Sequence, residues 1–188
     1  MRFIDDYTRM CWVYLLKNKS DAFQTFNNFH KWIENDAQSH IGSICIDNGK
    51  YYTLNEFENY LRQHGIKHQT IVPYNPQQNG VAERMNRKIL NMVRSMLFFK
   101  NVEIMFCVDA VLCAAYIKNR CPSNAIRDKT PYEMWYEHFP SVKQLRVLGS
   151  TYYALIPKVH RKKLGARSCK CIFLGIQTPP KHIVSMMK

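Results

Sequence analysis

The chain has 188 residues, of which 46% are hydrophobic, and it contains 3 Trp, 11 Tyr and 10 Phe. This content is enough for a packed core, so it excludes wholesale disorder, and the length fits one ordinary domain with an appendage. Lys and Arg number 27 against 14 Asp and Glu, which gives a net charge of +13 at pH 7. Such a charge favours nucleic acid as the partner, although a merely soluble basic protein would have the same balance.

The seven cysteines and seven histidines are scattered along the chain. Because no C-x-x-C pair occurs that could supply the thiolates of a zinc finger, we predict no zinc site, and we expect no histidine cluster. Most cysteines lie in apolar runs, where a reduced thiol packs as a small core residue, and this favours a reducing, intracellular compartment. No signal-peptide pattern or apolar run of about 20 residues is present, so we expect a soluble chain without a membrane partner.

The first elements are predicted from apolar runs and turn signals. Strand signals at residues 2–4 and 11–16 flank a turn-like stretch and predict a hairpin, and because the sequence opens within this hairpin we expect a further segment upstream of Met1. Residues 20–35 have apolar side chains at helical spacing, with Ser20 and Asp21 as the N-cap. The elements expected next are a strand over 41–46, a helix from a Thr53 cap to Gly65, a strand over 66–72 ended by Pro73, and helices over 80–99 and 103–119.

Two carboxylates stand at the ends of predicted elements. Asp47 follows the strand over 41–46, in the turn sequence Asp47-Asn48-Gly49, and Glu83 is expected in the first turn of the helix over 80–99. Residues 74–80 are predicted to be a mobile loop that feeds this helix. Acids held at a strand end and a helix start could share divalent metal ions, as two-metal phosphoryl transfer requires. The buried stripe of the helix is predicted to be Val81, Met85, Ile89, Met92 and Met96.

Later in the chain, Thr130-Pro131-Tyr132-Glu133 has the pattern of a capping box with proline at the first helical position. Strands are predicted over 145–148, 151–156 and 171–176, and a basic loop lies between the last two. Three strands seldom close a barrel, so this part resembles a truncated β module. The whole order of elements predicts an α/β protein.

At this point six ordered blocks of the sequence resemble the catalytic core of retroviral and LTR-retrotransposon integrases, most closely the copia type. The blocks are residues 3–9, 47–49, 73–87, 130–133, 145–149 and 170–175. The resemblance implies an RNase H-like mixed sheet flanked by helices. It also implies two domains: an integrase core over 1–143 without its first strand, and a partial β-barrel-like module with a tail over 144–188.

The resemblance also implies a function, namely DNA integration by metal-dependent polynucleotidyl transfer. The family uses two Asp and one Glu to hold two Mg²⁺ (or Mn²⁺) ions. Asp47 and Glu83 match the second and third of these catalytic, metal-binding acids, whereas the first has no match, and Asp5 and Asp6 match a strand-end pair outside the metal site. Lys50, beside Asp47, could compete with a metal ion. Metal binding is therefore expected only where the acidic site is completed.

Further residues are candidates for contact with nucleic acid. Asn86 and Arg87 match family positions that approach DNA, while the basic loop could bind phosphates or be merely solvated. The candidates in this loop are Lys158, Arg161, Lys162 and Lys163. The expected partners are duplex DNA and further copies of the chain, and the expected location is the nucleus.

Three interpretations follow for the chain as a whole. The first is an integrase-core fragment of a retrotransposon polyprotein that binds nucleic acid and is inactive alone, because it carries two of the three acids. The second is a repurposed, non-catalytic module that binds DNA or a partner. The third is a remnant that does not fold stably, since a sheet without one of its strands exposes an edge.

Overall fold

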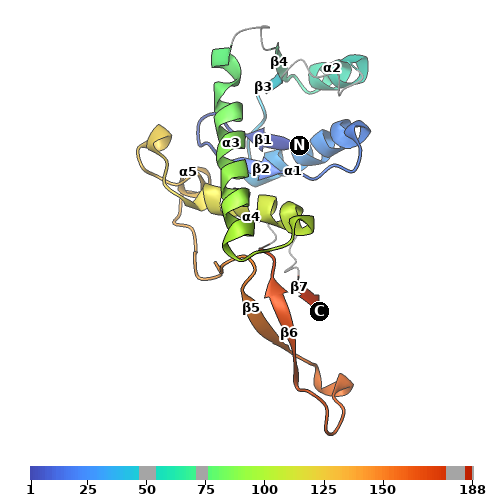
Figure 1. Cartoon of the computed structure of the whole chain (residues 1–188). Coiled ribbons are helices and arrows are strands. Elements are labelled where there is room, and N and C mark those ends of the chain that lie inside the picture. The colour runs from blue at the N-terminus through green and yellow to red at the C-terminus, as the bar shows by residue number, and fades with distance from the viewer. Residues whose placement is uncertain (47–53, 71–75, 177–184, 188) are drawn as a thin grey trace. The chain divides into compact units, whose positions relative to one another are not determined.

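The computed structural model describes residues 1–46, 54–70, 76–176 and 185–187 (Figure 1). The chain divides into two compact units, one of Met1–Phe3 with Tyr14–Met85 and the other of Ile4–Val13 with Asn86–Lys188. Within the described ranges, a membrane-spanning helix is not found, because every helix is too short or too polar.

The first unit is built on two amphipathic helices and a small parallel sheet. Helix α1 (Ala22–Ala37) follows the single 3-10 turn η1 (Lys19–Asp21), and helix α2 is Leu54–Gln63. Strands β3 (Ser43–Ile46) and β4 (Lys67–Thr70) pair in parallel. The buried centre of this unit consists of Phe26, Phe57, Leu61 and Ile66. These helices and strands confirm the predicted elements, with the strands shorter than expected and residues 47–53 and 71–75 outside the description.

Gly65 ends α2, as the sequence predicted. Its φ of +68° lies in the left-handed region, where glycine pays no Cβ penalty. The Ile66 N–H then donates to the Leu61 carbonyl at 2.9 Å, which closes the helix end. The chain is thereby turned directly into β4.

The predicted hairpin at the start of the chain is confirmed, with β1 (Arg2–Ile4) and β2 (Cys11–Val13) as a two-stranded sheet. Its turn depends on Asp5, whose Oδ2 accepts from both the N–H and the Oγ1–H of Thr8, each at 2.7 Å. Arg9 takes a positive φ of 62° to complete the turn. The second strand ends at Val13 rather than at residue 16.

Helix α3 (Pro76–Phe99) begins earlier than the sequence predicted. Proline is well suited to a first helical position because its φ is already helical and its missing N–H needs no partner there. Residues 76–80 are therefore helical, and the predicted loop over 74–80 is wrong for this part. Glu83 lies about two turns inside the helix, not in its first turn, so the macrodipole, which acts within the first turn, does not account for its position.

The buried side of α3 also differs in part from the predicted stripe. Met85 and Ile89 are buried as expected, and Val93 continues the line at a spacing of four residues. Val81, Met92 and Met96 are only half-buried. A line of residues spaced four apart drifts slowly around a helix that has 3.6 residues per turn. The elements that pack against each part of α3 therefore decide which of its apolar side chains are buried.

The second unit continues with helix α4 (Cys107–Arg120), which follows the 3-10 turn η2 (Ile104–Phe106). After a further 3-10 turn, η3 (Asn124–Ile126), comes the short helix α5 (Pro131–Tyr136). Its capping box is confirmed: Thr130 Oγ1 accepts from the Glu133 N–H at 3.1 Å, and Glu133 Oε2 accepts from the Thr130 N–H at 2.9 Å.

The last part of the chain forms an antiparallel sheet in the order β5-β6-β7. Its strands are Thr151–Leu155, Ser168–Phe173 and Ser185–Met187, of which the third was not predicted; a 3-10 turn, η4 (Lys158–His160), follows β5. The strand predicted over 145–148 is wrong. Backbone bonds from Leu145 to Val142 and from Ser150 to Val147 close turns there instead, and Gly149 has a φ of +82°.

Candidate metal centre and nucleic-acid interface

Glu83 lies on the exposed side of α3, away from the buried Met85 and Ile89. The carbonyl of its neighbour Ala82 accepts a hydrogen bond from Nη2 of Arg2 at 2.7 Å, which ties this turn of the helix to β1. The carboxylate is thus carried by a long, anchored helix and faces solvent. Carboxylate oxygens of this kind are hard ligands that suit Mg²⁺ or Mn²⁺.

Asp47, the second predicted metal ligand, lies outside the described residues, as does Lys50. Strand β3 ends at Ile46, directly before Asp47, and β4 lies beside it in parallel. In the described ranges, with 47–53 and 71–75 left out, His, Cys, Asp and Glu side chains form no group of three or more that could hold a metal ion. Glu83 and Asp47 therefore remain predicted ligands.

Asp5 and Asp6 are occupied within the hairpin turn. The Asp5 carboxylate accepts both hydrogen bonds from Thr8, and the Asp6 carboxylate pairs with the Arg9 guanidinium. An acid that caps its own turn is a local structural element. The geometry agrees with the interpretation of these residues as turn acids outside the metal site.

Asn86 and Arg87 are both exposed and follow Glu83 by three and four residues on α3. Residues at these spacings lie on the same side of a helix. A carboxylate, an amide and a guanidinium therefore share one exposed stripe of the helix, which is a suitable arrangement for a metal ligand next to groups that bind phosphate or base.

The basic loop between β5 and β6 exposes three of its four predicted DNA-binding side chains, Lys158, Lys162 and Lys163. Arg161 is half-buried because its Nε donates to the Ile156 carbonyl, so it braces the loop. The loop is also apolar at its surface, since Val159 and Leu164 are almost fully exposed.

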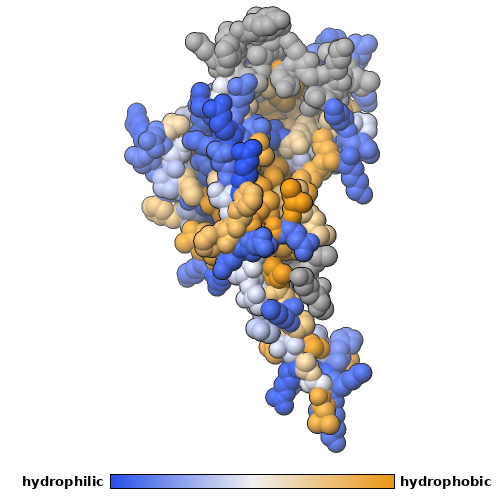
Figure 2. Space-filling model, viewed as in Figure 1, coloured by the Kyte–Doolittle hydropathy of each residue, from blue (hydrophilic) through white to orange (hydrophobic). Residues whose placement is uncertain are grey.

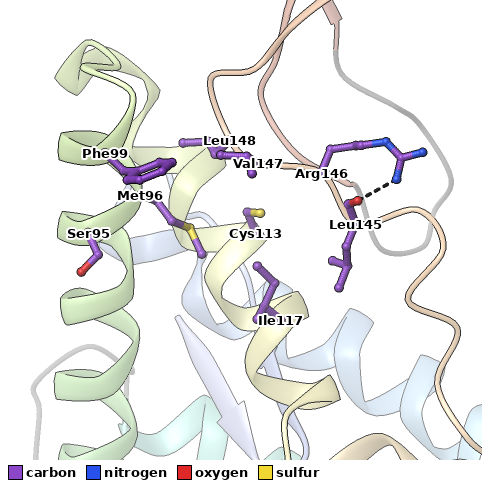
Figure 3. Close-up of a pocket in the computed structure, with 9 residues that line it drawn as sticks. All are labelled: Ser95, Met96, Phe99, Cys113, Ile117, Leu145, Arg146, Val147 and Leu148. Carbon is purple, nitrogen blue, oxygen red and sulfur yellow. Dashed lines mark hydrogen bonds between the residues drawn. The ribbon is translucent and has the colours of Figure 1, made fainter.

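A cavity of about 630 Å³ in the second unit was not predicted from the sequence. Its lining comes from α3, α4 and the turns over 145–148, and is almost entirely apolar (Figure 3). The Arg146 side chain is turned back, and its Nη1 donates to the Leu145 carbonyl at 2.7 Å. Since no acid lines this cavity, it is not the metal centre.

A histidine cluster in the first unit corrects the expectation that the histidines lie apart. His30 Nδ1 is 2.8 Å from Tyr60 Oη, and His30 Nε2 and His40 Nδ1 are 3.1 and 3.2 Å from Glu34 Oε1. Burial raises the pKa of Glu34, but the Ile41 N–H and the two histidines outweigh it, so this pKa lies below its usual value. Part of the cluster follows the i, i+4 spacing of His30 and Glu34, whereas the contact with Tyr60 depends on tertiary packing.

Comparison with known families finds two matches. Residues 1–76 match the family model described as the integrase core domain, and residues 150–182 match the retroviral polymerase SH3-like domain. The two matched segments fall at the beginning and near the end of the chain.

Curated relatives cover most of the chain. The chain is 43% identical over 173 residues to the retrovirus-related Pol polyprotein from transposon TNT 1-94 of Nicotiana tabacum. The aligned region covers 92% of this chain and 13% of that protein. The corresponding polyprotein from transposon RE2 of Arabidopsis thaliana is 34% identical, with 92% and 12% covered. The chain thus spans about an eighth of the length of these relatives.

Solved structures with a similar fold include a viral intasome and viral integrase catalytic cores. An intasome of simian T-cell lymphotropic virus in complex with PP2A regulatory subunit B56 gamma has a TM-score of 0.57 at 19% identity, with 89% of this chain and 60% of that chain covered. The HTLV-2 integrase catalytic core in complex with magnesium has a TM-score of 0.53 at 20% identity, with 71% and 82% covered. At this level of identity the likeness shows the fold, which is the α/β fold of integrase catalytic cores.

Proposed function

The chain belongs to the integrase-core family of copia-type, retrovirus-related Pol polyproteins, and on this basis we propose that it acts on duplex DNA as the polynucleotidyl-transfer segment of such a polyprotein. The observation that carries the proposal is the exposed stripe of α3. Glu83 stands there as a carboxylate on a rigid helix, with Asn86 and Arg87 one turn further on. The net charge of +13 supports a polyanionic substrate.

The proposed cofactor is Mg²⁺ or Mn²⁺, held by Asp47 and Glu83. The chemistry of the two carboxylates fits such an ion, and a similarly folded core was solved in complex with magnesium. When bound, the ions would activate the attacking hydroxyl and stabilise the leaving oxygen. The role of the chain itself is to hold Glu83 in place, through the helix and its anchor to Arg2, and to bind DNA at Asn86 and Arg87.

We propose further that residues 1–188 alone are catalytically inactive. Two acids match the three that the family uses, and Asp5 and Asp6 are engaged by Thr8 and Arg9. A missing acid removes several kcal/mol of transition-state stabilisation, and each ~1.4 kcal/mol lowers the rate about tenfold.

A strand-transfer assay tests this proposal. The chain is incubated with duplexes that mimic element ends, in Mg²⁺ or Mn²⁺, beside Glu83→Gln. We expect retention on duplex DNA without joined product for either protein. Robust joining that Glu83→Gln abolishes would show that the chain is active, and absence of duplex binding even at low salt would contradict a DNA substrate.

The non-catalytic alternative, a module that grips DNA, is favoured by the exposed cations of the β5–β6 loop. It predicts duplex affinity that falls steeply with salt and is indifferent to Glu83→Gln. A metal-dependent gain in affinity that Glu83→Gln removes would favour the catalytic proposal over this one.

The organisation of the chain is part of the proposal. An integrase core over residues 1–143 and a small barrel-like module over 144–188 are supported by the two family matches at 1–76 and 150–182. Self-association is supported by the similarly folded HTLV-2 integrase core, whose structure was solved in a trimeric and in a dimeric form. A nuclear location follows from chromosomal DNA as the substrate.

A further inference from the structure

The β5–β6 ribbon exposes an aromatic ring and an aliphatic side chain on one face. Tyr153 is 66% exposed and Leu155 is 74% exposed. Exposure alternates along β5, so Thr151, Tyr153 and Leu155 all point to this face, while Tyr152 and Ala154 point to the other. These two large side chains are therefore available for contact with a partner, on a ribbon where hydrophobic and hydrophilic residues lie side by side (Figure 2).

A cation lies directly across the ladder from the aromatic ring. The register pairs Tyr153 with Lys170 of β6, and Lys170 is exposed. Directly opposed residues of an antiparallel pair project to the same face with their Cβ atoms about 4.5–5.5 Å apart. The face therefore presents a ring and an ammonium group side by side.

The charge around this face selects a polyanion as its occupant. After Glu137 the sequence contains no Asp or Glu, so nothing acidic on this segment neutralises its cations. The cations of the ribbon and its loop are Lys158, Arg161, Lys162, Lys163, Arg167 and Lys170. The phosphate backbone of a nucleic acid complements such a surface.

The aromatic ring distinguishes between forms of nucleic acid. A duplex presents phosphates to a cationic ribbon, but its bases cover one another and offer no face to Tyr153. An unpaired strand offers both phosphates and base faces, and stacking on aromatic side chains is how sequence-tolerant single-strand binders gain affinity.

We propose that the exposed face of the β5–β6 ribbon binds single-stranded nucleic acid. Tyr153 stacks on an unpaired base, Leu155 packs against the neighbouring nucleotide, and Lys170 with the loop cations binds the phosphates. This rests on the proposed function in taking nucleic acid as the partner, and extends it by assigning an unpaired strand to this ribbon.

The experiment measures fluorescence anisotropy of the full chain with three labelled probes of about 12 nucleotides, a length within the range of single-strand binding sites. The probes are oligo(dT), an abasic strand with the same phosphates, and a duplex. We expect Tyr153→Leu to weaken oligo(dT) binding about fivefold or more and to leave the affinities for the other two probes within about twofold, since only oligo(dT) has an unpaired base that can stack on the ring. The separate variant Tyr153→Trp, which keeps an aromatic ring, should bind oligo(dT) about as tightly as the unsubstituted chain.

Two further variants complete the design. Tyr7→Leu is the matched control, because Tyr7 is also a highly exposed tyrosine, at 77%, and lies in the β1–β2 turn. It should change none of the three affinities. Lys170→Gln should lower the affinity for all three probes and make that affinity less dependent on salt, because the substitution removes a phosphate contact.

The outcomes separate this inference from the proposed function. If Tyr153→Leu leaves oligo(dT) binding unchanged, or weakens all probes equally, the stacking role is wrong even where duplex binding persists. Tyr153-dependent oligo(dT) binding without duplex binding would support the ribbon and contradict the duplex substrate. If no probe is retained at low salt, both fail, and the ribbon face belongs to a protein partner.

Discussion

Asn119 binds both backbone groups of Cys11 through its side-chain amide. The Cys11 N–H donates to Asn119 Oδ1 at 3.0 Å, and Asn119 Nδ2 donates to the Cys11 carbonyl at 2.7 Å. Both residues are buried, at 5% and 2% exposure. The side-chain amide of Asn119, on α4, therefore satisfies the backbone N–H and carbonyl of one β2 residue, as a neighbouring strand would.

We expect Asn119→Ala to lower the free energy of unfolding by about 2–6 kcal/mol. The substitution leaves a buried donor and a buried acceptor on Cys11 unpaired, at about 1–3 kcal/mol each. Urea denaturation measures this loss. Asn91→Ala, on the exposed side of α3, is the control and should change stability by less than about 0.5 kcal/mol. Equal midpoints for the two variants would show that the double hydrogen bond contributes little.

Gly149→Ala should destabilise the chain by about 2 kcal/mol or more. A Cβ at this position would lie 2.5 Å from Val102 Cγ2 and 2.8 Å from Lys100 Cβ, and the φ of +82° is already unfavourable for alanine. Thermal unfolding followed by circular dichroism measures the loss.

Substitutions at two other glycines separate the effect of the close contacts from that of the positive φ. Gly65 has a φ of +68° with open space around it, so Gly65→Ala measures the backbone strain alone, about 1–2 kcal/mol. Gly42 has neither a positive φ nor a close neighbour, so Gly42→Ala should be neutral or slightly stabilising. If Gly149→Ala is no worse than Gly65→Ala, the contact with Val102 and Lys100 relaxes at no cost.

The capping box of α5 should make stability depend on pH. Hydrogen bonding to Thr130 lowers the pKa of Glu133. A carboxyl whose pKa is lower in the folded state stabilises the fold above its unfolded pKa, and this contribution is lost as the pH falls through the folded pKa. The difference in Tm between the unsubstituted chain and Glu133→Gln should therefore be present at neutral pH and disappear in acid.

Thr130→Ala is the companion measurement, because it removes the other half of the box. It should cost about 1 kcal/mol at neutral pH, since Ala cannot accept from the Glu133 N–H. A Glu133→Gln difference that persists unchanged in acid would show that charge has no part in the cap.

Arg87→Ala should weaken binding to duplex DNA. It should also make the fall of log affinity with log salt less steep, by about 1 in the slope, as the loss of one phosphate contact does. Arg94→Ala is matched to it, because both residues are exposed on α3 and Arg94 already donates to Asn91. Electrophoretic mobility shifts at several salt concentrations compare the two. A larger effect from Arg94, which lies about two turns further along the same side of α3, would place the DNA nearer the C-terminal end of the helix.

The sequence predicted those features that depend on neighbours along the chain. The apolar spacing in residues 20–35, the left-handed end at Gly65 and the capping box at Thr130 each express a local rule, and the structure confirms them. Prediction failed where local signals were ambiguous. An apolar run at 145–148 is compatible with a strand or with turns, and the bonds of Val142 and Val147 select turns.

For the candidate site the division is the same. Glu83, Asn86 and Arg87 could be named from a motif, and their shared side of the helix follows from their spacing. The turn in which Glu83 lies could not be obtained this way, because Pro76 starts the helix before Gly80. Asp47 lies outside the described residues, so its predicted role stands as a prediction.

The sequence by itself determined the family, the positive charge and the amphipathic elements, because composition and short-range periodicity are properties of the chain alone. Only the tertiary structure decided which distant residues meet. It placed Asn119 against Cys11, Tyr60 against His30, and Lys170 across from Tyr153. Each of these pairs depends on packing or strand register, which long-range burial sets and no local pattern encodes.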